Sequence, residues 1–131
     1  MKSASRKIAK QTQYTKLGKL KKAIAEKINR PAADIYIDNN HLRHIFNKHK
    51  AELEQLGLTP KMFVDLVVAG FNRIYEGHRQ ALMLVLWNGK PKVTVIEMNL
   101  AFTNEEFYEV TTATVMSKEF FKNKVLIWKK E

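Results

Sequence analysis

RIYEGHRQALMLVLWNGKPKVTVIEMNL, residues 73–100, is the stretch that decides the fold class of this chain. Its apolar residues come in short runs rich in β-branched side chains, such as LMLVL and VTVI, which is typical of strands. Asn88-Gly89 separates two of these runs, and this pair is the strongest short-range signal for a β-hairpin turn. We therefore expect three strands in this stretch, joined by tight turns.

Three further strands are indicated outside this stretch. AADIYID (32–38), EEFYEVTTATVM (105–116) and KVLIWKK (124–130) have the composition and length of strands. SKEFFKN (117–123) favours a short helical turn instead. The second half of the chain is therefore expected to be mostly sheet.

Helices are expected at residues 20–28, 41–56 and 60–71, where apolar side chains recur at helical spacing. The middle helix has the apolar stripe Leu42, Ile45, Phe46, Leu53 and Leu56. Asp38, Asn39 or Asn40 can cap its start, and Thr59 followed by Pro60 is a strong start for the last helix.

A run of helices followed by a strand meander predicts an α+β fold. We expect N-terminal helices packed on one face of an antiparallel four- to five-stranded sheet. Residues 1–18 are expected to form a basic flexible arm, and residues 19–131 a single α+β domain, since 131 residues suit one domain.

The positive charge is concentrated at the start of the chain. Residues 1–30 hold ten lysines and arginines against one acid, Glu26, whereas residues 31–131 hold thirteen against twelve. Of the net charge of +10, nine charges therefore belong to the first thirty residues. A basic arm of this kind can bind phosphates by releasing counterions, or it can serve as a solubilising tail.

Composition also limits the compartment and the class of partner. The chain has no cysteine, which excludes disulfides and thiolate metal sites and suits a reducing compartment. No stretch approaches the roughly 20 apolar residues that cross a bilayer, and the basic start lacks the apolar segment of a secretory signal. We expect a cytoplasmic protein with no membrane partner and no cofactor.

Three of the four histidines, His41, His44 and His49, fall on the helix expected at residues 41–56. A metal site would need further converging ligands, and the chain has no HExxH or similar motif. The histidines are otherwise either polar residues on a solvated face or acid–base groups, because imidazole exchanges a proton near neutral pH.

HIFNKHK, from His44 to Lys50, precedes the helix end ELEQLG and a short apolar helix. Together with the hairpin that carries LMLVL and the Tyr-x-Val-Thr-Thr strand at residues 108–112, it resembles phage-borne and toxin nucleases of the barnase–EndoU–colicin–RelE superfamily. The resemblance covers residues 33–129, about three quarters of the chain.

This resemblance implies a ribonuclease with a helix and a four-stranded sheet that cleaves RNA without a metal. Such cleavage needs a base for the ribose 2′-hydroxyl, cations for the phosphorane and an acid for the leaving oxygen. His44 and His49 match the signature and are the implied acid and base. Thr111 or Thr112 matches the strand hydroxyl, which is expected to bind a phosphate oxygen.

Four more residues are candidates for substrate binding. Lys48 and Arg79 offer cationic donors to phosphate, Tyr108 offers a ring that can stack on a base, and His41 shares a helix face with His44. Each also has an ordinary structural explanation, such as a solvated lysine, a turn arginine or a half-buried tyrosine.

The expected function is a metal-independent RNA endonuclease of the toxin type, with RNA as its partner and an immunity or antitoxin protein as a candidate second partner. The alternatives are a non-catalytic nucleic-acid-binding module and a phage accessory module that binds another protein. A nuclease needs converging acid–base and cationic groups, whereas a binding module needs only a basic face.

Overall fold

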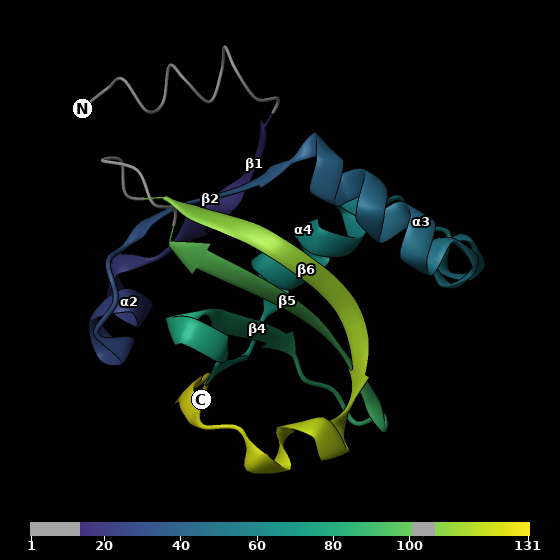
Figure 1. The fold of residues 1–131 in the computed structure, drawn as a ribbon. Helices are drawn as coiled ribbons and strands as arrows, with labels where there is room; N and C mark the ends of the chain where they lie inside the picture. The colour runs from purple at the N-terminus through teal and green to yellow at the C-terminus, as the bar shows by residue number, and fades with distance from the viewer. Residues whose placement is uncertain (1–13, 101–106) are drawn as a thin grey trace.

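The computed structural model describes residues 14–100 and 107–131, and these form an α+β fold (Figure 1). The strands are β1 (Tyr14–Leu20), β2 (Ala33–Asp38), β3 (Arg73–Glu76), β4 (Leu82–Leu86), β5 (Lys92–Leu100), β6 (Tyr108–Ser117) and β7 (Leu126–Lys129). The helices are α2 (Lys22–Ile28), α3 (Asn39–Leu56), α4 (Pro60–Gly70) and the 3-10 helices η1 (His78–Gln80) and η2 (Lys118–Asn123).

The seven strands form one mixed sheet in the order β1-β2-β6-β5-β4-β3-β7. β2 and β6 are parallel, and the other neighbouring pairs are antiparallel. The expected α+β class is therefore confirmed, but the sheet has seven strands instead of the expected four to five, and one of its strand pairs is parallel instead of antiparallel. Ile35 and Ile37 of β2 are buried and alternate with partly exposed residues, which is the pattern of a half-buried antiparallel strand, so the sequence of β2 does not indicate its parallel pairing with β6.

β1 is the strand that the sequence did not predict. Residues 14–18 had been assigned to a flexible arm, whereas they pair with β2 at one edge of the sheet. Residues 1–13 of that expected arm lie outside the described residues. β1 carries few apolar side chains because only one of its faces meets the core, through Leu17 and Leu20.

The helix boundaries follow the local signals closely. Asp38 caps α3 by accepting a hydrogen bond from the backbone N–H of His41 (2.8 Å). Thr59 caps α4 through the backbone N–H of Met62 (3.1 Å), with Pro60 at its start. The first helix starts at Lys22 rather than at residue 20, since β1 continues through Leu20.

Two hydrophobic cores lie on opposite faces of the sheet. Leu84 belongs to the first core, and its neighbours Met83 and Val85 belong to the second, because successive residues of a strand point to opposite faces. The first core includes residues of α2, α3 and α4, and the second includes Phe121 of η2. The three α-helices therefore pack on one face, as expected.

The apolar stripe of α3 is buried only along part of its length. Ile45 and Leu53 are buried, and Leu42 and Phe46 pack against the first core. Leu56, which helical spacing placed on the same stripe, is 63% exposed. It is the last residue of α3, where the chain turns at Gly57 in the left-handed conformation.

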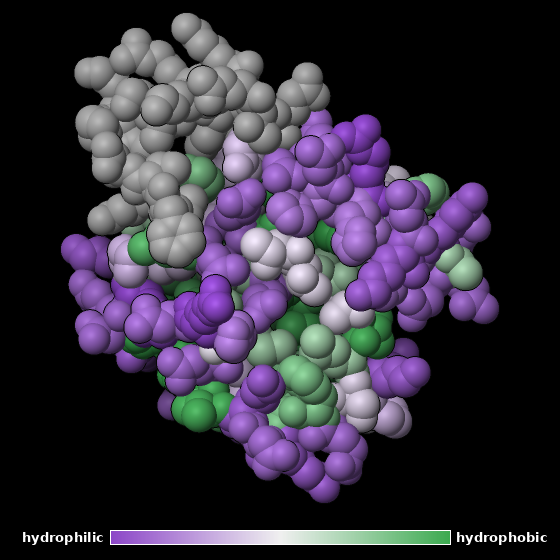
Figure 2. Space-filling view, viewed as in Figure 1, coloured by the Kyte–Doolittle hydropathy of each residue, from purple (hydrophilic) through white to green (hydrophobic). Residues whose placement is uncertain are grey.

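The view in Figure 2 shows hydrophilic residues over most of this side of the molecule, and a smaller hydrophobic area in the lower centre, around the place of β4 and β5 in Figure 1. In the described part of the chain, no helix combines the length and apolar character that a membrane span requires.

Gly18 is the position in β1 where a side chain has no room. A Cβ atom there would lie 2.9 Å from Cγ1 of Val68 on α4, and a β-branched side chain has little freedom to move aside. We predict that Gly18→Ala lowers the free energy of unfolding by roughly 1–3 kcal/mol, as overpacking does. Gly89→Ala is the matched control, since a Cβ there would meet nothing within 4 Å. Urea unfolding measures both, and equal losses would contradict the packing of β1 on α4.

Candidate functional site

Polar side chains from three strands and one helix converge where β2 ends and α3 begins. Antiparallel pairing of β1 with β2 sets Tyr14 opposite Asp38. Parallel pairing of β2 with β6 sets Tyr36 beside Glu109. His41 follows in the first turn of α3, which starts directly after Asp38. Tyr14, Asp38, His41 and Glu109 are called the acid–base site below.

Two pairs of side chains in the acid–base site are in direct contact, and the two pairs lie close to each other. The Tyr14 hydroxyl donates a hydrogen bond to Oε2 of Glu109 (3.1 Å), and Nδ1 of His41 lies 3.0 Å from Oδ2 of Asp38. One ligand atom from each of Asp38, His41 and Glu109 lies within 4.8 Å of the others. The Asp38 side chain is 13% exposed and that of His41 is 34% exposed, so solvent or a ligand reaches the site from the histidine side.

His41 has a buried atom that the protein does not fully satisfy. Its Nδ1 is buried and makes no hydrogen bond of good geometry within residues 14–100 and 107–131. The ion pair with Asp38 is the contact that compensates it when the ring is protonated. A buried nitrogen that lacks a full hydrogen bond lowers the stability of the fold, and unsatisfied or perturbed polar groups of this kind are concentrated at functional sites.

An aromatic cluster holds Tyr14 in place. The rings of Tyr14, Tyr36 and Phe107 meet edge to face, with centroid separations of 6.2, 6.0 and 5.4 Å. Phe107 is 6% exposed, so the cluster is anchored in the interior. Because such edge-to-face contacts favour one geometry, they fix the hydroxyl of Tyr14 near Glu109.

The electrostatics of the acid–base site keep Tyr14 protonated. Burial is the largest cause, and together with the charge and hydrogen bond of Glu109 and the charge of Asp38 it raises the pKa of Tyr14 to about 12. At neutral pH the phenol therefore keeps its proton and acts as a hydrogen-bond donor to Glu109.

The same donors have the composition of a metal site. Asp38, His41 and Glu109 offer two carboxylates and an imidazole, a set that Zn²⁺ or Mn²⁺ accepts. Two carboxylate oxygens already accept hydrogen bonds, from the backbone N–H of His41 and from the hydroxyl of Tyr14. The cluster therefore offers either an acid–base set or a three-residue metal site, and the two differ in their response to a chelator.

The two histidines of the nuclease signature lie on different sides of α3. Five residues of α-helix separate His44 from His49, a rotation of about 140°, and the helix is distorted at His49 (φ −123°, ψ 24°). His44 is exposed. The His49 side chain is 13% exposed, and its Nδ1 lies 2.8 Å from Oε1 of Glu52, whereas its buried Nε2 has no hydrogen bond within the described residues.

The strand residues of the signature are mostly engaged in structure. The Thr111 hydroxyl donates to the backbone oxygen of Glu97 (3.3 Å), and Thr112 pairs with Glu97 in the sheet register. In the described part of the chain, none of His44, His49, Thr111 and Thr112 forms a hydrogen bond with another of the four.

Tyr108 is not available for stacking on a base. It is 2% exposed, and its hydroxyl donates to the backbone oxygen of Pro31 (2.7 Å). The expectation of base stacking at Tyr108 is therefore wrong, because strand pairing turns its ring into the first core.

The remaining substrate-binding candidates differ in their surroundings. Lys48 is exposed on α3, and Arg79 is exposed in η1 with a left-handed backbone (φ 53°). His41, which was assigned to substrate binding, belongs to the acid–base site instead of lying beside a catalytic His44. The structure thus groups His41 with residues that the sequence had not paired with it.

Three members of the acid–base site were missed from the sequence. Glu109 is the unspecified residue of the Tyr-x-Val-Thr-Thr motif, and Tyr14 belongs to the segment 1–18 that the sequence predicts as a flexible arm. Asp38 was recognised only as a candidate helix cap. Its spacing of three residues from His41 is a signal that sequence reasoning had available, because such a pair at a helix start lies on one face.

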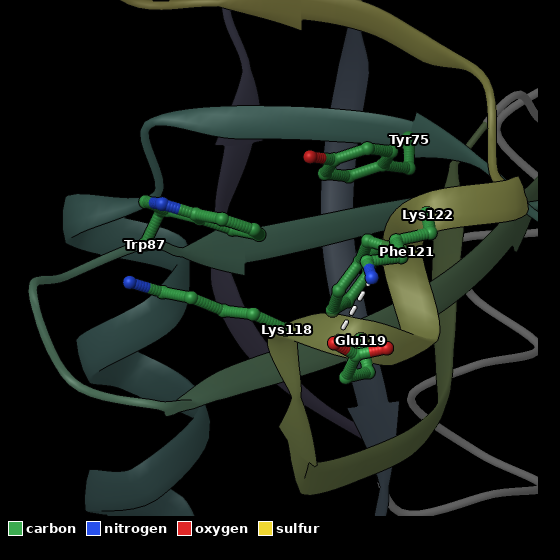
Figure 3. Close-up of a pocket in the computed structure, with 6 residues that line it drawn as sticks. All are labelled: Tyr75, Trp87, Lys118, Glu119, Phe121 and Lys122. Atoms are coloured by element: carbon green, nitrogen blue, oxygen red, sulfur yellow. Dashed lines mark ion pairs between the residues drawn. The ribbon is translucent and has the colours of Figure 1, made fainter.

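A second group of side chains surrounds a cavity of about 280 Å³ beside η2. Its lining residues are Tyr75, Trp87, Lys118, Glu119, Phe121 and Lys122 (Figure 3). Figure 3 shows the three rings facing one another, with the Lys118 side chain extending toward Trp87.

The cations at this second cavity already have partners. Lys122 forms an ion pair with Glu119 (3.1 Å). Lys118 donates to the backbone oxygen of Asn88, and its ammonium nitrogen lies 5.0 Å from the centre of the Trp87 ring. The cavity is therefore electrostatically satisfied by the protein itself.

Comparisons of this chain with protein-family models, with curated proteins and with solved structures found no significant match.

The high pKa of Tyr14 gives a direct test of the acid–base site. We predict that Glu109→Gln lowers the pKa of Tyr14 from about 12 toward its ordinary 10.0 without reaching it, because burial, the largest cause, remains. A pKa raised on folding means that the stabilising contribution of Tyr14 is present below pH 10 and is lost as the pH rises toward 12. Ultraviolet titration of tyrosinate measures the shift, and the Tyr14→Phe variant shows which part of the titration curve belongs to Tyr14. An unchanged titration in Glu109→Gln would show that the two side chains do not interact.

Proposed function

We propose that this protein is a metal-independent RNA endonuclease that cleaves by transesterification through the ribose 2′-hydroxyl. The observation that carries the proposal is the convergence of Glu109, His41, Asp38 and Tyr14 at one partly exposed position. The nuclease resemblance of residues 33–129 supports the same reaction class. The proposed compartment is the cytoplasm, and an immunity or antitoxin protein is a proposed partner.

The acid–base site supplies the groups that this chemistry needs. Glu109 accepts the proton of the 2′-hydroxyl, and the 2′-oxygen attacks phosphorus while the bond from phosphorus to the 5′-oxygen breaks. Protonated His41, paired with Asp38, gives its proton to the departing 5′-oxygen. The products are a 2′,3′-cyclic phosphate and a free 5′-hydroxyl. Tyr14 holds the Glu109 carboxylate in position through its hydrogen bond.

Cations must accompany these acids, because two carboxylates repel a phosphate. Lys16 and Lys19 lie on β1 beyond Tyr14, and residues 1–13 of the sequence carry four lysines and arginines directly before it. Lys16 lies 3.4 Å from Asp34, whereas Lys19 forms no ion pair within the described residues, so Lys19 is the β1 lysine that a phosphate can contact without competing with an acid. The lysines of β1 and the four basic residues that precede it in the sequence would favour RNA binding by counterion release.

One observation favours the second candidate function, a non-catalytic nucleic-acid-binding module. His44 and His49, which the nuclease signature implies as acid and base, lie on different sides of α3, and Thr111 is bonded to the backbone. A chain that kept only its basic surface would bind RNA without cutting it.

The test is cleavage of single-stranded RNA in the presence of EDTA. We predict 2′,3′-cyclic phosphate ends and no cleavage when the 2′-hydroxyl at the cut site is replaced by hydrogen. Glu109→Gln and His41→Ala should each lower the rate by roughly 10²–10⁴, the usual contribution of a general acid or base. Asp38→Asn should also lower the rate while preserving the helix cap, since Asn and Asp cap equally well.

His44→Ala and His49→Ala are the matched controls on the same helix. If these two variants lose activity and Glu109→Gln does not, the reaction class stands but the acid–base site is not its catalytic centre. Cleavage that appears only with added Mn²⁺ or Zn²⁺ would replace the acid–base mechanism by a metal site at Asp38, His41 and Glu109. Binding without cleavage under all these conditions would leave the non-catalytic module.

A further inference from the structure

A cavity of about 190 Å³ lies between the two edge strands of the sheet, far along β1 from the acid–base site. Lys19 of β1 and Trp128 of β7 both line it, although β1 and β7 are at opposite ends of the strand order. α2 contacts β7 and so bridges the two edges. The sheet is therefore curled, and the cavity lies at the gap between its edges. It is called the edge cavity below.

The rim of the edge cavity is basic and has no acid to balance it. Lys19, Lys21 and Lys130 line it, and none of its lining residues is Asp or Glu. Within the described residues, none of the three ammonium groups forms a hydrogen bond or an ion pair. Three unpaired cations at one small cavity favour an anionic ligand.

The floor of the edge cavity is apolar and partly aromatic. It is made by Ile24 of α2, Val68 of α4, Phe71 and Trp128. The Phe71 and Trp128 rings meet at a centroid separation of 5.6 Å and an angle of 61°, and both are half-buried. They therefore present a fixed aromatic surface beside the three cations.

A basic rim over an aromatic floor is the combination that binds single-stranded nucleic acid. Bases of any sequence stack on aromatic rings, and lysines contact the phosphates. The second cavity beside η2 has rings and lysines too, but its Lys122 is paired with Glu119 and its Lys118 with a backbone oxygen. Of these two cavities, the edge cavity is the one whose lysines have no protein partner within the described residues and can bind a ligand.

β1 provides a continuous path between the acid–base site and the edge cavity. Its residues Tyr14, Lys16 and Lys19 lie opposite Asp38, Tyr36 and Asp34 in the sheet register. These partners alternate with Ile35 and Ile37, which face the first core, so Tyr14, Lys16 and Lys19 share the outer face. Tyr14 and Lys19 are five residues apart, about 16 Å along a strand.

We infer that the edge cavity binds one unpaired nucleotide of the RNA substrate, with its base against Phe71 and Trp128 and its phosphates on Lys19, Lys21 and Lys130. The inference rests on the proposed function for the identity of the substrate. The bound nucleotide lies away from the cut site, and β1 sets the distance between the two.

The two tryptophans of the chain, Trp87 and Trp128, allow the edge cavity to be observed alone. In full-length Trp87→Phe protein, Trp128 is the single tryptophan reporter. The probe is a short 2′-O-methyl RNA, which cannot be cleaved through its 2′-oxygen, with adenosine and inorganic phosphate as separate arms. We predict that the oligonucleotide changes the fluorescence of Trp128 at low salt, and that adenosine or phosphate alone binds much more weakly.

Two sets of variants test the ligand contacts. Lys19→Gln with Lys21→Gln and Lys130→Gln should reduce the slope of log K against log[salt] by about 1.4, since one nucleotide has two flanking phosphates and each phosphate contact on a single strand contributes about 0.7. The matched control neutralises three lysines near η2, Lys118, Lys122 and Lys124, and should leave the slope almost unchanged. Trp128→Ala, made in the protein that keeps Trp87, should weaken binding of the oligonucleotide by roughly 5- to 150-fold, the range for loss of one stacked base. Binding to this variant is measured by fluorescence anisotropy of a labelled oligonucleotide.

The outcomes separate this inference from the proposed function. If the oligonucleotide binds by anisotropy but Trp128 fluorescence does not change, and the two triple-lysine variants behave alike, the edge cavity is not a nucleotide site. RNA cleavage that persists in that case leaves the endonuclease proposal intact. If the edge cavity responds as predicted but no variant or condition gives cleavage, the nucleotide site stands and the endonuclease proposal is overturned.

Discussion

The parallel pairing of β2 with β6 is the constraint on which the candidate site depends. It pairs Tyr108 and Glu109, at the start of β6, with Ile35 and Tyr36 in the middle of β2. The strand partner of Glu109 is therefore only two residues before Asp38, where β2 ends and α3 begins. With antiparallel pairing in its place, the start of β6 would lie at the other end of β2, and Glu109 would be far from His41. Because α3 follows β2 without a loop, the helix start is held as rigidly as the strand that precedes it.

β1 connects this arrangement to the edge cavity. As an edge strand it completes the pairing of β2, and its first residue, Tyr14, donates a hydrogen bond to Glu109. Its core-facing residues attach it to the helices, whereas its outer face carries lysines. One strand therefore links the acid–base site to the edge cavity, because the alternation of a strand separates a packing face from a binding face.

The distribution of paired and unpaired cations distinguishes the surfaces of the molecule. Near η2, lysines are engaged by an acid, a backbone oxygen or an aromatic ring. At the edge cavity they have no such partner within the described residues. Net charge alone does not make this distinction, since both regions are rich in lysine. What matters for an anionic ligand is whether the protein already supplies the counter-charge.

The sequence by itself determined the features that depend on near neighbours in the chain. The β4–β5 hairpin connection falls at Asn88-Gly89, as a loop of five residues (87–91) in which neither residue has a positive φ, rather than as the expected tight turn. Thr59-Pro60 set the start of α4, and apolar spacing separated helices from strands, because helix caps are local hydrogen-bonding problems. Only the tertiary structure decided the rest. It made a strand of residues 14–20, turned Tyr108 inward and Glu109 toward His41, and brought the sheet edges together. These outcomes depend on which strands pair and in which direction, and the groups involved are separated in sequence by dozens of residues, so no local pattern records them.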